Sequence, residues 1–159
     1  MVNLLDLSAA RARLALVPDP EIPAVTLVDL GIVRDLRETA SGVEVVLTPT
    51  YSGCPATELI ADDVRAALAE FGDVTVTMQR APAWSTDWIT PTGREKLRQY
   101  GIVPPQCNAE QAVHIVPRLR CPRCDSASTQ QLSRFGSTAC KATWRCTACG
   151  EPFEYFKPL

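Results

Sequence analysis

The fold class of this 159-residue chain is decided by residues 121–150, which read CPRCDSASTQQLSRFGSTACKATWRCTACG. Two Cys-x-x-Cys pairs, Cys121/Cys124 and Cys146/Cys149, stand at the two ends of this stretch. Each pair offers two thiolates from one tight turn, and two such turns complete a tetrahedral shell around a zinc ion. The spacing therefore predicts a four-cysteine zinc ribbon over residues 119–159. Four thiolates leave no coordination position open, so the zinc is expected to be structural, although iron also accepts four sulfurs.

Three further cysteines lie outside these pairs: Cys54, Cys107 and Cys140. Seven cysteines are an odd number, which is a poor basis for a disulfide framework and favours a reducing compartment. Cys140 lies within the loop of the ribbon. It is interpreted as a small buried hydrophobic residue, and the alternatives are that it joins the metal site or reaches toward Cys54. The sequence assigns no role to Cys107.

Charge divides the chain near the same place as the cysteines. Residues 1–105 hold nine Lys or Arg against fourteen Asp or Glu, whereas residues 106–159 hold seven against four. Pro104 and Pro105 stop any preceding helix, because proline lacks the amide donor that a helix needs. We therefore expect an α/β domain over residues 1–104, a linker over residues 105–118 and the ribbon domain over residues 119–159.

The N-terminal part has the hydrophobic periodicity of a small α/β sandwich. Apolar residues recur at helical spacing in two segments, a third segment has the pattern of a short helix, and three short segments between turn signals have the pattern of strands. The expected order is helix 6–17, strands 32–37 and 43–48 as a hairpin, a helix ending at 71, strand 74–78 and a short helix from 91. This α-β-β-α-β-α order predicts one mixed sheet with helices packed on it, followed by the ribbon.

Cys54 is the candidate reactive residue of this part. It precedes Pro55 and the amphipathic helix, so we expect Cys54 at the N-cap and Pro55 at the first helical position. Helix amides pointing at the sulfur would lower the pKa of the thiol and favour the thiolate, which is both a nucleophile and a soft-metal ligand. A buried cysteine that fills a gap fits the same spacing. A cysteine hydrolase is disfavoured, since the single histidine, His114, falls in the expected linker.

Composition excludes several classes of function. The net charge is −2 and the isoelectric point is near 5.4, which argues against a protein that coats nucleic acid or an anionic membrane. The basic and aromatic residues of the ribbon leave nucleic-acid binding as a minor alternative. No uncharged stretch is long enough to span a bilayer, and the first residues lack a secretory pattern, so a cytoplasmic location is expected. Neither a dinucleotide nor a phosphate-binding motif occurs, and no Glu-x-x-His pair occurs, so we expect no catalytic activity of its own.

Several motifs, in order along the chain, carry a family resemblance. They are DPEIP (19–23), LVDLGIV (27–33), TPTYSGCPA (48–56), WSTDWI (84–89) and FGSTACK (135–141). Together with the Cys-x-x-Cys pairs, they resemble the PaaD (or PaaJ) family of bacterial phenylacetate degradation. The N-terminal part is similar to the metal–sulfur cluster biosynthesis family, which includes SufT-like proteins.

The resemblance implies an accessory role in the phenylacetyl-CoA epoxidase system. Such a protein would assist iron–sulfur or iron assembly on the reductase or the oxygenase component. The family pattern implies that Cys54 contacts iron or a cluster transiently, and it includes Asp19, Glu21 and Thr50. Cys140, or Cys54 of a second subunit in a homodimer, would complete the site. The alternative is a non-catalytic structural subunit that docks on the oxygenase.

Overall fold

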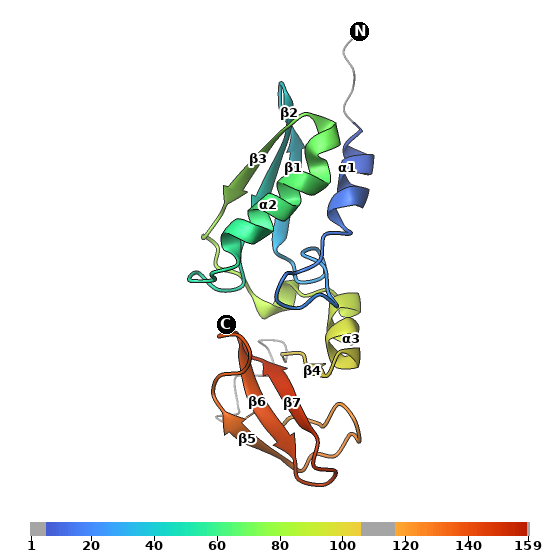
Figure 1. Ribbon diagram of the computed structural model, residues 1–159, viewed down its shortest axis with the longest axis vertical. Coiled ribbons are helices and arrows are strands. Elements are labelled where there is room, and N and C mark those ends of the chain that lie inside the picture. Colours follow the sequence, from blue (N-terminus) through green and yellow to red (C-terminus); the bar gives the residue numbers. More distant parts are fainter. Residues whose placement is uncertain (1–5, 106–116, 159) are drawn as a thin grey trace. The chain divides into compact units, whose positions relative to one another are not determined.

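The computed structural model describes residues 6–105 and 117–158. The chain divides into two compact units, Met1–Trp84 and Ser85–Leu159. Figure 1 shows a three-stranded sheet with helices in the first unit and a four-stranded sheet in the second. The mixed α/β class and the ribbon that the sequence predicts are both confirmed.

The first unit is built on a mixed sheet in the order β1-β2-β3. Strands β1 and β2 form the expected antiparallel hairpin, and β2 runs parallel to β3 because a helix connects them. The elements are α1 (Leu7–Leu14), β1 (Val33–Glu38), β2 (Gly42–Leu47), α2 (Thr57–Leu68), the 3-10 helix η1 (Ala69–Phe71) and β3 (Asp73–Met78). Helix α1 ends three residues earlier than expected, at a C-cap on Ala15.

The core of the first unit lies between this sheet and its helices. Val43, Val45 and Leu47 alternate along β2 and are fully buried, as the period of a strand requires. Helix α2 contributes an apolar stripe that includes Val64 and is likewise removed from solvent. At the start of β2, Gly42 is required because a Cβ there would collide with the backbone of Asp73 on the neighbouring strand.

The second unit carries the ribbon as a sheet in the order β4-β7-β6-β5. Its elements are the 3-10 helix η2 (Thr86–Trp88), α3 (Pro91–Gln99), β4 (Ile102–Val103), β5 (Thr129–Ser133), β6 (Lys141–Cys146) and β7 (Pro152–Phe156). Strands β5, β6 and β7 pair antiparallel, whereas β4 joins β7 in parallel. Trp144 and Tyr155 pack edge to face at 6.4 Å between ring centroids in its small core.

The division into units places residues 85–105 with the ribbon. Because Ile102 and Val103 pair with β7, helix α3 and the following turn belong to the second unit. The domain boundaries at 104 and 118 stay a prediction, and most of the expected linker, residues 106–116, lies outside the described residues.

A buried ion pair joins β6 to β7 in the ribbon. The Lys141 side chain is only 3% exposed, and its Nζ lies 2.8 Å from Oε2 of Glu154, which is 26% exposed. Oε1 of Glu154 accepts a hydrogen bond from the Ser137 amide at 2.7 Å. Burial alone would raise the pKa of Glu154, but the hydrogen bonds from Lys141 and Ser137 outweigh it and lower that pKa.

We expect Glu154→Gln to destabilise the ribbon by about 2 kcal/mol, because it leaves the Lys141 ammonium buried without a counter-charge. This is less than the roughly 3–5 kcal/mol typical of a broken buried pair, since glutamine keeps an acceptor and the site is partly exposed. Hydrogen exchange of the β6 amides in the metal-loaded chain measures the change. Asp62→Asn, which breaks the exposed pair with Arg65, is the control and should change little.

The contribution of the Lys141–Glu154 pair to the stability of the ribbon should also depend on pH. Because the folded pKa of Glu154 is depressed, its contribution is present above the unfolded pKa and is lost as the pH falls through the folded value. Wild type should therefore lose protection on acidification, whereas Glu154→Gln should lose less. Equal protection of the two proteins at neutral pH would show that the pair contributes nothing.

Candidate metal centre and thiol site

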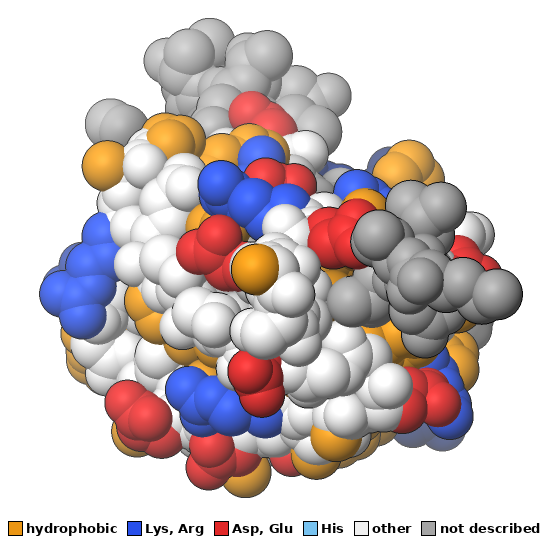
Figure 2. All heavy atoms as spheres, turned by 90° about the horizontal axis from the view of Figure 1, so that it is seen from above, with side chains coloured by type: hydrophobic (Ala, Val, Ile, Leu, Met, Phe, Trp, Pro, Cys, Tyr) orange, Lys and Arg blue, Asp and Glu red, His pale blue; other side chains and the backbone are white. Residues whose placement is uncertain are grey.

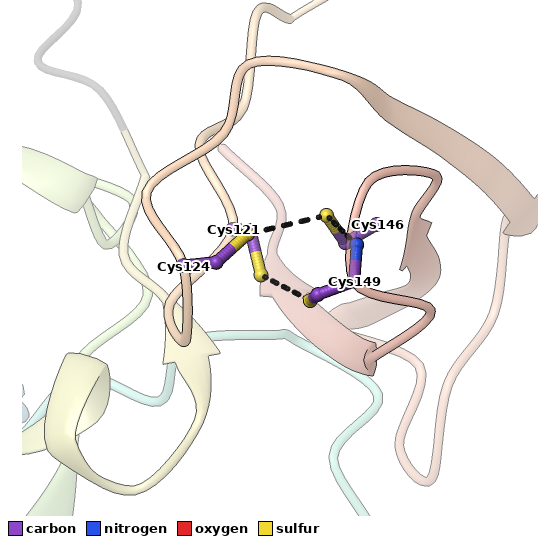
Figure 3. Close-up of side chains that lie close together, drawn as sticks. All are labelled: Cys121, Cys124, Cys146 and Cys149. Atoms are coloured by element: carbon purple, nitrogen blue, oxygen red, sulfur yellow. Dashed lines mark hydrogen bonds between the residues drawn. The ribbon is translucent and has the colours of Figure 1, made fainter.

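Four cysteine sulfurs meet between the two knuckles of the ribbon (Figure 3). Cys121 and Cys124 come from the turn before β5, and Cys146 and Cys149 come from the turn between β6 and β7. The Sγ atoms of Cys121 and Cys149 are 3.7 Å apart, and those of Cys124 and Cys146 are 3.6 Å apart. A tetrahedron with zinc–sulfur bonds of about 2.3 Å has edges of about 3.8 Å. These two distances match such edges, and all four sulfurs lie within 4.8 Å of one another, as a shared metal ion requires.

Backbone amides stabilise negative charge on this cluster. The Arg123 amide lies 3.4 Å from Sγ of Cys121, and the Cys149 amide lies 3.5 Å from Sγ of Cys146. The Cys149 amide is the first of the hydrogen bonds that lower the pKa of Cys146 to about 6, against the effect of burial.

Neighbouring sulfurs shift the pKa values of Cys124 and Cys146 in opposite directions. The Ser126 amide favours the thiolate of Cys124, but the thiol of Cys149, burial and the other two thiols outweigh it and raise the pKa of Cys124 to about 12. Without a cation, therefore, the cluster holds thiols as well as thiolates. A divalent ion would favour the thiolate of Cys124, so its binding would release a proton.

An ion pair that the sequence does not reveal links the two knuckles. Arg123, inside the first knuckle, donates from Nη1 to Oε2 of Glu151 beyond the second knuckle at 2.6 Å. The two residues are 28 positions apart, so only the folded ribbon brings them together. Glu151 is also the first cause that raises the pKa of Arg123, followed by the negative charge of Cys149.

Cys54 lies in the turn before α2 and not at its N-cap, so that expectation was wrong. The helix begins at Thr57 with Ala56 at the N-cap. The Thr57 hydroxyl donates to the Cys54 carbonyl at 2.7 Å, and the Thr57 amide reaches the same oxygen at 3.3 Å. These bonds close an extra turn ahead of the helix, which moves the cap two residues downstream of Cys54.

The expected lowering of the Cys54 pKa is also wrong. Burial is the largest effect and raises the pKa of the half-buried thiol, and the charges of Glu21 and Asp19 raise it further. Hydrogen bonds from the Ala56 amide and the Thr57 side chain lower it by less. The structure thus brings Cys54, Asp19 and Glu21 into one electrostatic neighbourhood. Such a group holds a neutral thiol but favours a cation nearby.

Asp19 has a structural role as well. Its Oδ1 accepts hydrogen bonds from the amides of Glu21 and Ile22 at 2.9 and 2.8 Å, and its side chain is largely buried. The carboxylate therefore fixes the turn that presents Glu21 next to Cys54. Thr50 lies half-buried in the loop that leads to Cys54, and its expected role stays a prediction.

We expect Glu21→Gln to increase the reactivity of Cys54. Removing this carboxylate removes one cause of the raised pKa, so a larger fraction of the thiol ionises at a given pH below that pKa. Alkylation of the Cys54 peptide by iodoacetamide at pH 8, followed by mass spectrometry, should be about twofold or more faster than in wild type. Glu38→Gln, on the exposed edge of β1, should leave the rate unchanged. A slower rate in Glu21→Gln would contradict this electrostatic assignment.

Of the remaining cysteines, the structure describes only Cys140, and Cys140 does not join the four-sulfur cluster. Cys140 is buried at the start of β6, with its Sγ 3.0 Å from the Thr138 hydroxyl. Cys146 ends the same strand, roughly 20 Å away at the rise of a strand, so Cys140 stands outside the four-sulfur cluster. Cys140 and Cys54 belong to different units, and a link between them stays a prediction. Cys107 and His114 lie outside the described residues.

Two surface observations bear on the binding of membranes and nucleic acids. Among the described residues, the helices are too short or too polar for one to traverse a bilayer. On the face drawn in Figure 2, acidic and basic side chains of the described residues are interspersed, and neither sign dominates.

Comparison with protein families matches both parts of the chain. A model described as "PaaD zinc beta ribbon domain" matches residues 105–157. A model described as "Iron-sulfur cluster assembly protein" matches residues 7–78, which include Cys54, Asp19 and Glu21.

Curated relatives and a solved structure extend these matches. The chain is 52% identical, over 92% of its length and 89% of the relative, to a subunit of the "Putative 1,2-phenylacetyl-CoA epoxidase" of Escherichia coli (strain K12). It is 34% identical, over 55% of its length and 80% of the relative, to the "Fe-S protein maturation auxiliary factor YitW" of Bacillus subtilis (strain 168). A Bacillus anthracis crystal structure titled as a domain of unknown function, DUF59, covers 57% of this chain and 89% of its own, with a TM-score of 0.53 and 28% identity.

Proposed function

Since this chain belongs to the PaaD family of phenylacetyl-CoA epoxidase proteins, we propose that it is an accessory protein of a phenylacetyl-CoA epoxidase system. In this proposal it assists iron or iron–sulfur assembly on the reductase or the oxygenase component. Iron or a cluster is the cargo, and Cys54 is its contact on this chain. The chain performs no epoxidation of its own.

The grouping of Cys54 with two carboxylates is the observation that carries this proposal. A half-buried thiol whose pKa is raised by burial and by Glu21 and Asp19 is a poor nucleophile at neutral pH. Cys54 offers a soft sulfur donor, and the negative charges of Glu21 and Asp19 favour a cation near it, which would in turn favour the thiolate. This combination suits brief contact with iron better than covalent catalysis. The match of residues 7–78 to an iron–sulfur assembly model supports it.

The ribbon would hold a resident zinc ion through Cys121, Cys124, Cys146 and Cys149. Zinc would supply folding energy to a unit whose own core is small, on the order of 10–16 kcal/mol for structural sites. Its role is structural because four thiolates close the coordination shell. The proposal places the protein in the cytoplasm, where thiols stay reduced.

The epoxidase components, made with and without this chain, test the proposal. The iron and sulfide content of the purified reductase and oxygenase is measured after identical expression. We expect one component to lose iron when the chain is absent, and to regain it when the chain is co-produced. Unchanged iron in both components would contradict an assembly role.

A second candidate function is a non-catalytic subunit that docks on the oxygenase. The name of the Escherichia coli relative, which describes that protein as a subunit of the epoxidase, favours this function. This function predicts that the chain co-purifies with the oxygenase in stoichiometric amounts and that client iron does not change. A homodimer, in which Cys54 of two subunits shares the cargo, would appear as a doubled mass after iron loading.

A further inference from the structure

A cavity of about 560 Å³ lies in the second unit, beside the first knuckle of the ribbon. Cys54 belongs to the first unit and is not among the residues that line the cavity. Among the residues that the structure describes, its lining includes one acidic residue, Asp125, and four arginines, which are Arg98, Arg118, Arg120 and Arg123. We propose that this cavity binds a small organic phosphate. The inference is independent of the role proposed for Cys54, because every lining residue belongs to the ribbon unit.

The charges of the lining make an anion the expected ligand. Within residues 6–105 and 117–158, no acidic residue forms an ion pair with Arg118. Arg120 pairs with Asp125 at 3.1 Å and Arg98 pairs with Glu95 at 3.3 Å, but all four side chains are more than half exposed. Exposed pairs of this kind are weak, so a ligand of higher charge can displace the carboxylates.

Neutralising the negative charge of the cysteine thiolates does not explain why all four arginines lie around this cavity. Arg123 is engaged with Glu151 and faces the charges of Cys149 and Cys121, so it belongs to the metal centre. Arg98, by contrast, comes from the end of α3, outside the two knuckles that carry the sulfurs. A side chain from that helix is not needed to neutralise the cluster. The cavity gathers it with Arg118 from a separate segment.

The shape of the cavity favours a small phosphate ester over an acidic protein surface. Its volume falls within the range of about 300–1,000 Å³ that is usual for small-molecule sites. Val103, Pro104 and Leu119 give it apolar walls that suit the organic part of such a ligand. Guanidinium groups bind phosphate in a bidentate manner, and several of them together discriminate phosphate from a single carboxylate.

Calorimetric titration of the metal-loaded full chain at low salt tests the proposal. Coenzyme A and pyrophosphate are the probes, and pantetheine, which lacks phosphate, is the negative ligand. We expect both phosphate probes to bind and pantetheine not to bind. Arg118→Gln should weaken coenzyme A binding about tenfold, and binding should fall as salt rises. Arg145→Gln, on β6 outside the cavity lining, should bind as wild type does.

Metal content and circular dichroism of each variant establish that it is folded. Failure of both phosphate probes to bind to folded wild type would overturn the proposal. Equal binding by Arg118→Gln and wild type would overturn it as well, since the charge would then lie elsewhere. Binding of polyglutamate without binding of either phosphate probe would overturn it too, and would identify the surface as a protein contact. None of these outcomes depends on iron assembly by Cys54.

Discussion

Cys124→Ser is expected to abolish metal binding by the ribbon and to unfold its three long strands. Wild type should hold one metal ion per chain, and the variant should hold close to none after dialysis against a chelator. Two sulfur pairs lie 3.6 and 3.7 Å apart, as they would around a bound ion, and serine cannot supply the fourth thiolate. Because structural zinc contributes on the order of 10–16 kcal/mol, the small core around Trp144 should not hold without it.

Elemental analysis and hydrogen exchange measure this result on the full chain. Exchange should become fast in β6 and β7 while β2 in the first unit stays protected. Cys140→Ser is the matched control, because Cys140 lies in the same ribbon but outside the cluster, and it should keep its metal. If Cys124→Ser retains a full equivalent of metal, the four-sulfur site is not the binding site.

Cys54→Ala is expected to reduce the iron content of the client component to the level found without the chain. The thiol is the soft donor that lies in the field of Asp19 and Glu21, and alanine removes it with little loss of volume. Iron and sulfide in the purified epoxidase components measure the effect. Ser52→Ala, in the same exposed turn, should support normal assembly.

A second variant distinguishes the two residues that could serve as the partner ligand of Cys54, namely Cys140 and Cys54 of a second copy. If Cys140 is a partner ligand, Cys140→Ala should lower client iron as Cys54→Ala does, although its ribbon stays metal-loaded. If a second copy supplies Cys54, Cys140→Ala should act as wild type. Full client iron with Cys54→Ala would mean that the thiol is not the contact.

The features that depend on local spacing could be predicted from the sequence. The two Cys-x-x-Cys turns, the β1–β2 hairpin and the stripe of α2 each follow from residues close together in the chain. The N-cap at Cys54 could not be predicted correctly, because Pro55 at a first helical position looks the same whether or not Thr57 closes an extra turn before the helix. That choice depends on one side-chain hydrogen bond.

The electrostatics of both sites depend on contacts between distant residues. Glu21 is 33 positions from Cys54, and nothing in the local helix-cap pattern indicates that its charge opposes the thiolate. Likewise, Arg98 and Arg118 are separated by the segment 106–116, and only the second unit gathers them around one cavity. Burial and long-range charge therefore set the chemistry of Cys54, whose position the sequence singles out, and they form the cavity, which the sequence does not predict.

Anaerobic loading of the zinc-bound chain with ferrous iron and sulfide, followed by visible absorption and EPR spectroscopy, tests the assembly role most directly. We expect thiolate–iron absorption in wild type that disappears in Cys54→Ala, while zinc in the ribbon stays at one equivalent in both proteins. An identical iron spectrum in Cys54→Ala, or no iron bound by wild type, would contradict the assembly role.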